Sequence, residues 1–236
     1  MPIYKLKLID RKEVARGTIE FIFEKPEGFS FKPGQYGGFT LAHISLTSPG
    51  SMTRRFSILS TPQDKHLTIA SRMQNSDYKN VLKDLPLGSE IKFAGPTGNF
   101  VLHEDAVTPA VFIAGGIGVT PFYCMIRDAL QKNSTQALTL FYGNQAIYDA
   151  AYLTELQQLE HEHANFKIIP VMATDPEWQG ETGFISYEII KKYVSNLNAP
   201  IYYVCGSPMM VKALHETLNE LGVSEEKIKA EDFPGY

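Results

Sequence analysis

The second half of the chain alternates short apolar runs with helical segments, and this rhythm limits the fold more than any other feature. Past Asp105, each run of strand length is followed by a stretch with helical periodicity. Strand–helix alternation is typical of a parallel sheet covered by crossover helices. The predicted strands are Ala110–Ala114, Ala137–Tyr142, Phe166–Met172 and Ile201–Cys205, and the predicted helices are Pro121–Gln131, Ala151–His163, Ile185–Asn196 and Pro208–Leu221.

The first half has a different pattern, in which turn signals separate short strands. Six such strands with one brief helix predict a small antiparallel barrel, because closure removes open strand edges. We therefore expect a two-domain fold: an antiparallel six-stranded Greek-key β-barrel over residues 1–103, followed by an α/β parallel-sheet nucleotide-binding domain over residues 104–236. The predicted strands are Tyr4–Ile9, Thr18–Glu24, Gly38–Ile44, Arg55–Leu59, His66–Arg72 and Glu90–Ala94, and the helix is Asp77–Leu85.

Charge and hydrophobicity exclude several classes of protein. The net charge of -4 over 236 residues argues against nucleic-acid binding, which needs a basic field. No apolar run approaches the roughly 20 residues of a membrane span, and the first residues begin no signal peptide. We therefore expect a cytoplasmic protein without a membrane span.

Two cysteines, Cys124 and Cys205, are too few for a disulfide framework or a four-cysteine iron–sulfur cluster held by this chain. His161 and His163 are spaced for different faces of a helix, so we expect no metal site.

A glycine-rich turn follows the first strand of the second half, in the stretch Ala114-Gly115-Gly116-Ile117-Gly118-Val119-Thr120-Pro121. Ligands of parallel sheets bind outside the carboxyl ends of the strands. Bare glycine backbone can approach a pyrophosphate there, at the positive end of the next helix. Tight strand–helix packing is the structural alternative.

The stretch Arg54-Arg55-Phe56-Ser57-Ile58-Leu59-Ser60 combines a cation, an aromatic ring and a hydroxyl inside an extended apolar run. Side chains alternate along a strand, so Arg55 and Ser57 point one way and Phe56 the other. This combination suits a flavin nucleotide, which carries phosphate, a ring system and a polar ring edge. An ordinary edge strand is the alternative.

Together these stretches resemble the ferredoxin-NADP reductase superfamily, the FAD-binding oxidoreductases that include NAD(P)H-dependent flavin and ferredoxin reductases. The resemblance covers nearly the whole chain and depends on the order of several motifs. They are the Arg-x-Phe-Ser stretch, the Gly-Gly-x-Gly-x-Thr-Pro turn, Lys32–Tyr36, Gly95–Phe100, Phe141–Asn144 and Val204–Met210.

The resemblance implies a role for several residues. Arg55 would pair with the flavin phosphate, Phe56 would lie against the isoalloxazine, and Ser57 would hydrogen-bond near N5. Cys205 would lie beside the nicotinamide C4. The acidic-aromatic tail Glu231–Tyr236 is similar to tails that fold over the flavin, with a frayed terminus as the alternative, and its Glu231 would steady the nicotinamide amide or the one-electron-reduced flavin. The residues expected to be catalytic are thus Ser57, Cys205 and Glu231. Further cofactor-binding residues are Ile69, Ala70, Ser71, Lys79, Asn80, Gly116, Gly118, Thr120, Pro121, Gly143, Asn144, Gly206, Met209, Phe233 and Tyr236.

Two departures from the family pattern bear on the cofactors. The Gly-x-x-Ser that commonly meets the flavin pyrophosphate is replaced by Ser76-Asp77-Tyr78-Lys79, where Lys79 would supply a charged contact. FAD is the expected flavin, ahead of FMN. Gln145 and Asp149 follow the second strand where NADPH-preferring relatives often carry Arg or Lys. A neutral amide and a carboxylate fit a ribose diol better than a 2′-phosphate, which favours NADH over NADPH.

The expected reaction is hydride transfer from NAD(P)H to bound FAD, then electron delivery to a separate acceptor such as a ferredoxin, a flavodoxin or an oxygenase component. An acidic acceptor would dock on Lys5, Lys7, Arg11, Lys12 and Arg16, although these residues also suit a solvated edge. One alternative is an NAD(P)H:flavin reductase that uses free flavin as its substrate. The segments Trp178–Gly183 and Tyr148–Leu156 are similar to segments of such flavin reductases. The other is a non-catalytic redox-sensing subunit.

Overall fold

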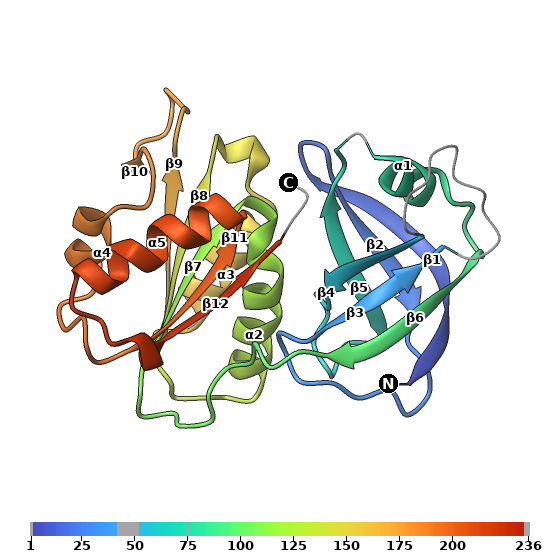
Figure 1. Ribbon diagram of the computed structural model, residues 1–236, viewed down its shortest axis with the longest axis horizontal. Helices are drawn as coiled ribbons and strands as arrows, with labels where there is room; N and C mark the ends of the chain where they lie inside the picture. Colours follow the sequence, from blue (N-terminus) through green and yellow to red (C-terminus); the bar gives the residue numbers. More distant parts are fainter. Residues whose placement is uncertain (1, 42–51, 75, 234–236) are drawn as a thin grey trace.

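Two six-stranded sheets lie side by side in the computed structural model, which describes residues 2–41, 52–74 and 76–233 (Figure 1). The predicted third strand beyond Leu41 and the predicted flavin contact Tyr236 lie outside the described residues.

The first sheet is antiparallel throughout, with strand order β4-β3-β6-β1-β2-β5. The Leu59 amide donates to the Thr68 carbonyl at 2.9 Å, which joins the segment after β4 to β5 and closes the barrel. Alternation builds its core: in β1 the side chains of Leu6 and Leu8 are buried, whereas Lys5 and Lys7 are exposed. The strands are β1 (Ile3–Ala15), β2 (Thr18–Glu24), β3 (Tyr36–Thr40), β4 (Thr53–Ser57), β5 (His66–Arg72) and β6 (Glu90–Thr97).

Helix α1 (Asp77–Asp84) covers one end of the barrel and buries Tyr78 and Leu82. It begins after Ser76, whose hydroxyl accepts a hydrogen bond from the Lys79 amide at 3.3 Å. This side-chain cap satisfies one of the amides that the first helical turn leaves unpaired.

The second sheet is parallel throughout, with strand order β10-β9-β8-β7-β11-β12. Its strands are β7 (Ala110–Gly115), β8 (Leu138–Asn144), β9 (Phe166–Met172), β10 (Glu181–Thr182), β11 (Ile201–Gly206) and β12 (Ile228–Asp232). Helices α2 (Val119–Gln131) and α3 (Leu153–Glu162) pack on the face toward the barrel, and α4 (Tyr187–Tyr193) and α5 (Pro208–Glu220) pack on the other face (Figure 1). Short 3₁₀ turns are η1 (Gly116–Gly118), η2 (Ile147–Asp149) and η3 (Glu225–Lys227).

The expected fold class, an antiparallel barrel followed by a parallel α/β sheet, is confirmed. The parallel sheet has six strands where the sequence predicted four, because β10 and β12 were missed. Glu231 was expected in a terminal tail but lies in β12, an edge strand with mostly polar side chains. The expected boundary between residues 103 and 104 falls in the segment between the end of β6 and the start of β7.

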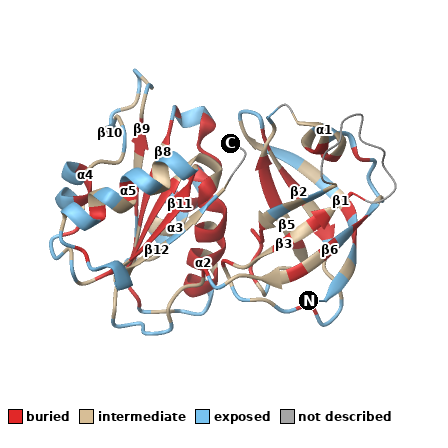
Figure 2. Ribbon diagram, viewed as in Figure 1, coloured by how far each residue is buried: buried red, intermediate tan, exposed pale blue. Residues whose placement is uncertain are grey.

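The two halves share part of their core. The apolar cluster of α2, α3 and the parallel sheet also contains Leu59, Ala70 and Phe100, which come from the barrel half and the connecting segment. Figure 2 shows buried residues running through both sheets and along α2, where the halves meet. The relative placement of the halves is therefore fixed by side-chain packing as well as by the chain connection.

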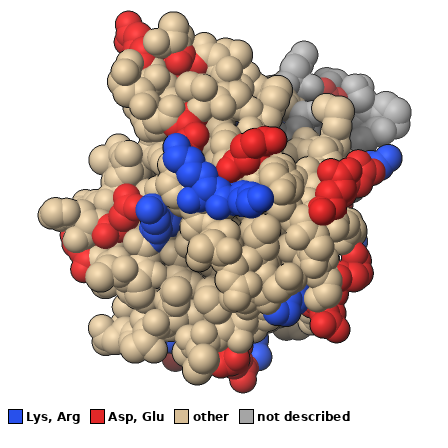
Figure 3. Space-filling view, turned by 90° about the vertical axis from the view of Figure 1, so that its left-hand side faces the viewer, with Lys and Arg blue, Asp and Glu red and all other residues tan. Residues whose placement is uncertain are grey.

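Among the helices of the described residues, none has both the length and the apolar character needed to cross a lipid bilayer. In the view of the outer face of the α/β half, the main group of cations lies near the middle, and further cations and acidic side chains are scattered toward the edges (Figure 3). Among the described residues of this face, cations and acidic groups are mixed rather than gathered into a broad basic field.

Candidate functional site

Strand β4 divides the predicted flavin motif between its two faces. Arg54 and Phe56 lie on one face: the Arg54 guanidinium is 5.4 Å from the centre of the Tyr78 ring in α1, and the Phe56 ring is 6.1 Å from the same ring. Arg55 and Ser57 lie on the other, where Arg55 is exposed and its guanidinium is 5.8 Å from the Tyr36 ring. The predicted alternation is thus observed, and the arginine next to α1 is Arg54 rather than Arg55.

Three cations gather near the start of α1. The Lys79 ammonium donates to the Arg72 carbonyl at 2.8 Å, and its pKa is lowered, first by burial and then by the positive charges of Arg54 and Arg72. Excess positive charge beside a helix N-terminus favours an anionic ligand. Lys79, singled out in the sequence as a departure from the family pattern, lies within this cluster.

Ser57 ends β4 with a buried hydroxyl that has no hydrogen-bond partner among the described residues. An unpaired buried hydroxyl costs about 1–3 kcal/mol, so a ligand with a polar edge would compensate for it. The nearby strand β5, which contacts the η1 turn, carries Ile69, Ala70 and Ser71; all three are buried, Ile69 in the barrel core and Ala70 in the apolar cluster shared with the α/β half. Asn80, also predicted as a cofactor contact, is an exposed residue of α1.

The glycine turn brings the start of α2 against β11. Gly116 has a φ of 51°, a left-handed conformation that favours glycine, and a Cβ on Gly118 would lie 2.5 Å from the Cys205 carbonyl oxygen. Thr120 is buried behind the turn, with its hydroxyl donating to the Ile117 carbonyl at 3.0 Å. Glycine is needed here because the helix approaches the strand closely. This tight strand–helix packing is the structural alternative to pyrophosphate binding that the sequence analysis left open.

A cavity of about 530 Å³ opens at the carboxyl ends of the parallel strands. Four predicted cofactor residues line it: Gly116, Gly143, Asn144 and Met209. Arg72 and Gln74 reach it from the barrel, and Arg72 is the one charged residue among the described residues of its lining. Two apolar side chains at the cavity, Phe184 and Met209, are 79% and 81% exposed, so they offer open contact surface to a ligand.

Cys205 and Glu231 are neighbours in the register of β11 and β12. Cys205 is fully buried, and burial together with the Glu231 and Asp232 charges raises the pKa of its thiol well above the usual value. Burial, and then Asp232, raises the pKa of Glu231 to about 7, and its Oε2 atom has no partner among the described residues. This thiol is therefore neutral at neutral pH, while the carboxyl can hold or release a proton there.

The remaining predicted residues lie close by. Pro121 is buried in the first turn of α2, and Gly206 ends β11. The Phe233 amide donates to the Gly206 carbonyl at 3.0 Å, which brings the residues after β12 to the same end of the sheet.

The sequence interpretation of Asp149 is wrong. Its carboxylate was expected to face a ribose, but the side chain is 5% exposed and is bound by Arg16 at 3.0 Å in two places and approached by Arg72 at 3.9 Å. Both arginines belong to the barrel, so Asp149 joins the two halves. Gln145 does line the cavity, as expected.

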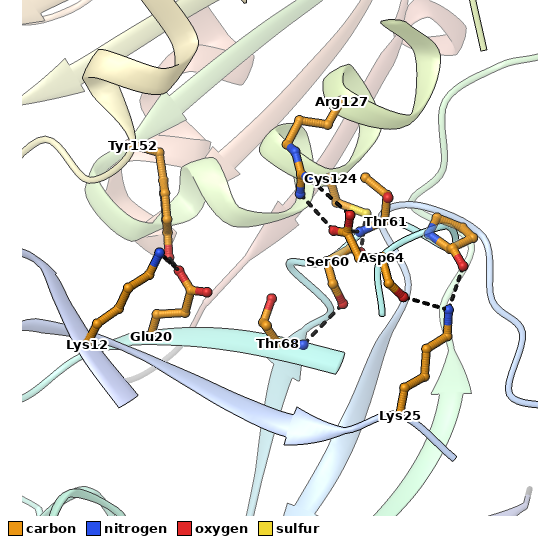
Figure 4. Close-up of polar contacts among 11 residues, drawn as sticks. Lys12, Glu20, Lys25, Ser60, Thr61, Asp64, Thr68, Cys124, Arg127 and Tyr152 are labelled. Atoms are coloured by element: carbon orange, nitrogen blue, oxygen red, sulfur yellow. Dashed lines mark hydrogen bonds and ion pairs between the residues drawn. The ribbon is translucent and has the colours of Figure 1, made fainter. Parts of the chain in front are cut away.

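A second group of polar contacts joins the barrel to α2 and to the start of α3 (Figure 4). They surround a crevice of about 360 Å³. The contacts between the halves are Arg127 to Asp64 at 2.9 and 3.1 Å, Tyr152 to Glu20 at 3.0 Å, and the Cys124 thiol to the Ser60 carbonyl at 3.0 Å. Within the barrel, Lys12 pairs with Glu20 at 3.5 Å. None of the described residues that were predicted to bind cofactors lines this crevice.

These observations fit a flavin nucleotide and a pyridine nucleotide. The orphaned Ser57 hydroxyl and the cation cluster suit the first, and the glycine turn with its cavity suits the second. Three contributing residues were missed in the sequence: Arg54, Arg72 and Phe184. For Arg54, the spacing of the Arg-x-Phe-Ser motif already marks the arginine three residues before Ser57, and the other two become site residues only through the tertiary fold.

Residues 112–216 match a family described as the oxidoreductase NAD-binding domain. The chain is 30% identical over 221 residues to the F subunit of the Na(+)-translocating NADH-quinone reductase of Marinomonas sp. (strain MWYL1), covering 86% of this chain and 54% of that protein. It is 30% identical over 215 residues to the naphthalene 1,2-dioxygenase system ferredoxin–NAD(P)(+) reductase component of Pseudomonas putida, covering 88% and 62%. The chain thus spans little more than half the length of these relatives.

Solved structures of reductases have a similar fold. The cytochrome P450 reductase GcoB of Amycolatopsis superposes with a TM-score of 0.85 at 25% identity, covering 98% of this chain and 70% of that one. A ferredoxin NADP+ reductase from Neisseria gonorrhoeae with bound FAD and NADP superposes with a TM-score of 0.84 at 19% identity, covering 98% of both chains, and supports the fold.

Proposed function

Because the chain belongs to the ferredoxin-NADP reductase-like FAD- and NAD-binding oxidoreductases, we propose that it is an NAD(P)H-dependent flavoprotein reductase. In the proposed reaction, hydride moves from NAD(P)H to FAD, and the electrons then pass to a separate acceptor. The observation that supports this most is the junction of the two halves, where strand β5, which carries residues expected to meet a flavin, contacts the η1 turn, which carries residues expected to meet the pyridine nucleotide.

We assign the flavin phosphates to the face of β4 that carries Arg54. Arg54 and Lys79 stand beside the start of α1 and would hold the pyrophosphate, with Arg72 adding positive charge. Ser57, on the opposite face, would donate its unpaired hydroxyl to a polar atom at the ring edge. Phe56 remains a proposed ring contact through the part of its side chain that Phe39 and Tyr78 leave uncovered.

The nucleotide would lie in the cavity at the carboxyl ends of the parallel strands. Gly116 offers bare backbone for the pyrophosphate, and Arg72 offers the one charge of the described lining. The exposed ring of Phe184 supplies a flat apolar surface for the adenine. Since no second cation stands near Gln145 in this lining, NADH is the proposed donor ahead of NADPH.

When bound, FAD supplies the chemistry of hydride acceptance and electron release. The protein orients the two ring systems and excludes water between them. Cys205 contributes as a neutral, buried packing residue, since its raised pKa removes the thiolate. Glu231, with a pKa of about 7, can donate a hydrogen bond when protonated and accept one when ionised.

The acceptor is proposed to be a separate redox protein, such as a ferredoxin, a flavodoxin or an oxygenase component, and the cytoplasm remains the proposed compartment. The cations suggested as its docking site are already engaged: Arg11 donates to the Leu85 carbonyl, and the other four pair with carboxylates. These pairs are Lys5 with Glu90, Lys7 with Glu24, Lys12 with Glu20, and Arg16 with Asp149. We therefore expect little salt-dependent docking through this edge.

Anaerobic mixing with NADH and with NADPH tests the proposal. The purified protein should stay yellow through gel filtration, and NADH should bleach its flavin absorbance. Colourless protein that oxidises NADH only when flavin is added would instead identify a flavin reductase with a free flavin substrate. A bound flavin that neither nucleotide reduces would point to the redox-sensing subunit and refute the enzyme.

A further inference from the structure

We propose that Asp149 is a positioning residue that holds Arg72 over the nucleotide cavity, and that Arg16 fixes Asp149 for this purpose. This inference rests on the proposed binding of a pyridine nucleotide in that cavity. It assigns a functional role to the tip of the β1–β2 hairpin, which does not line the cavity itself.

The tip of the β1–β2 hairpin contacts the segment after β8 through Arg16, which makes three kinds of contact. The Arg16 guanidinium makes a bidentate pair with Asp149, with Nε to Oδ1 and Nη2 to Oδ2 both at 3.0 Å. The Arg16 amide donates to the Tyr148 carbonyl at 2.8 Å, and the Arg16 guanidinium lies 4.1 Å from the centre of the Tyr148 ring. A planar guanidinium held at a carboxylate and an aromatic face has little freedom to move, so the position of Asp149 is fixed from the barrel side.

Asp149 in turn contacts Arg72. The Arg72 Nη2 atom lies 3.4 Å from the Asp149 carbonyl oxygen and 3.9 Å from Oδ1. The Arg72 side chain is 28% exposed, so part of it remains open to the cavity that it lines. The carboxylate is shared between two guanidinium groups, which leaves positive charge at Arg72 for an anionic ligand.

Arg72 also connects the two proposed cofactor sites. Its carbonyl accepts the hydrogen bond from Lys79 in the cation cluster, and its side chain reaches the nucleotide cavity. Without the Asp149 carboxylate, Arg72 would keep only its hydrogen bond to the backbone carbonyl at position 149, so its long side chain would regain part of its rotamer freedom, which nucleotide binding would have to restrict again. Flavin binding would change little, because the backbone contact to Lys79 does not use the Asp149 carboxylate.

The experiment measures the affinity of the flavin-loaded protein for ADP-ribose by calorimetry. ADP-ribose carries the pyrophosphate and the adenine but no nicotinamide, so its binding does not depend on flavin reduction. Asp149→Asn should weaken ADP-ribose binding by about three- to ten-fold with flavin content unchanged. In an Arg72→Gln background the same change should have no further effect, since Asp149 acts through Arg72.

Asp64→Asn is the matched control, because Asp64 makes a similar bidentate pair across the halves, with Arg127, and lies outside the cavity lining. It should leave ADP-ribose affinity unchanged even if it lowers the unfolding temperature. If Asp149→Asn does not fold, Arg16→Gln, a change of a side chain that is 63% exposed, tests the same chain of contacts and should weaken binding less strongly.

Two results would overturn the inference while the proposed function stands. One is wild-type affinity for ADP-ribose in Asp149→Asn, or in Arg16→Gln if Asp149→Asn does not fold. The other is an undiminished effect of the same substitution in the Arg72→Gln background. Wild-type protein that fails to bind ADP-ribose would overturn both the inference and the proposed nucleotide site.

Discussion

The adjacent arginines of β4 give the most discriminating prediction, because they are the same residue type on opposite faces of one strand. Arg54 stands by α1 and raises the positive potential at Lys79, whereas Arg55 is exposed beside Tyr36. If the flavin phosphates bind next to α1, Arg54→Gln should release flavin and Arg55→Gln should not.

The size of the effect follows from the contact that is lost. A hydrogen bond from a charged group contributes about 1.5–3 kcal/mol, and each 1.4 kcal/mol is about ten-fold in affinity. Lys79 and Arg72 remain in the cluster, so we expect the lower part of this range, about ten-fold weaker binding for Arg54→Gln. Arg55→Gln should change affinity less than about two-fold.

Flavin retained after gel filtration, followed by titration of the stripped protein with FAD and detection by flavin fluorescence, measures both variants. Arg54→Lys should recover part of the affinity, since a point charge replaces the planar fork. Equal loosening by Arg54→Gln and Arg55→Gln, or a greater loss from Arg55→Gln, would refute the assignment of faces.

Other predictions concern the reaction, pH, donor choice and packing. Ser57→Ala should slow flavin reduction by NADH about 10- to 100-fold in rapid mixing while flavin stays bound. The pKa of Glu231 is raised to about 7 from a usual 4.5, so between these pH values the folded state holds a proton that the unfolded chain releases. The free energy of unfolding should therefore gain a contribution from this proton that is complete below about pH 4.5 and disappears as the pH rises to about 7. Urea unfolding should show this pH dependence in the wild type and not in Glu231→Gln. Gln145→Arg should raise kcat/KM for NADPH about ten-fold relative to NADH in steady-state assays, and an unchanged ratio would contradict the proposed position of the 2′-phosphate. Gly118→Ala would press a methyl group on the Cys205 carbonyl, so its urea midpoint should fall by the equivalent of about 1–3 kcal/mol.

Local patterns were sufficient to predict most of the architecture. Lys5-Leu6-Lys7-Leu8 alternates as an amphipathic strand must, and the glycine turn before Pro121 marks a strand–helix junction in any parallel sheet. The predicted sharing of a face by Arg55 and Ser57 was also correct. Whether that face meets α1 depends on barrel curvature, which no local pattern contains.

The remaining features arise from contacts between distant segments. Asp149 looked like a ribose ligand from its place after β8, but two arginines 133 and 77 positions away bind it. Strand β12 was missed because Glu231 and Asp232 resemble a polar tail, and pairing with β11 alone makes them a strand. Such strands at a sheet edge have one neighbour and need no apolar alternation.

The shared apolar cluster at the junction has a consequence for protein engineering. Leu59, Ala70 and Phe100 are built into the core of the α/β half, so cutting the chain within the connecting segment would expose apolar surface on both fragments. In chimeras that exchange one half for that of a related reductase, these three residues should come from the same parent as the α2 surface against which they pack. Otherwise the chimeras should not remain monodisperse.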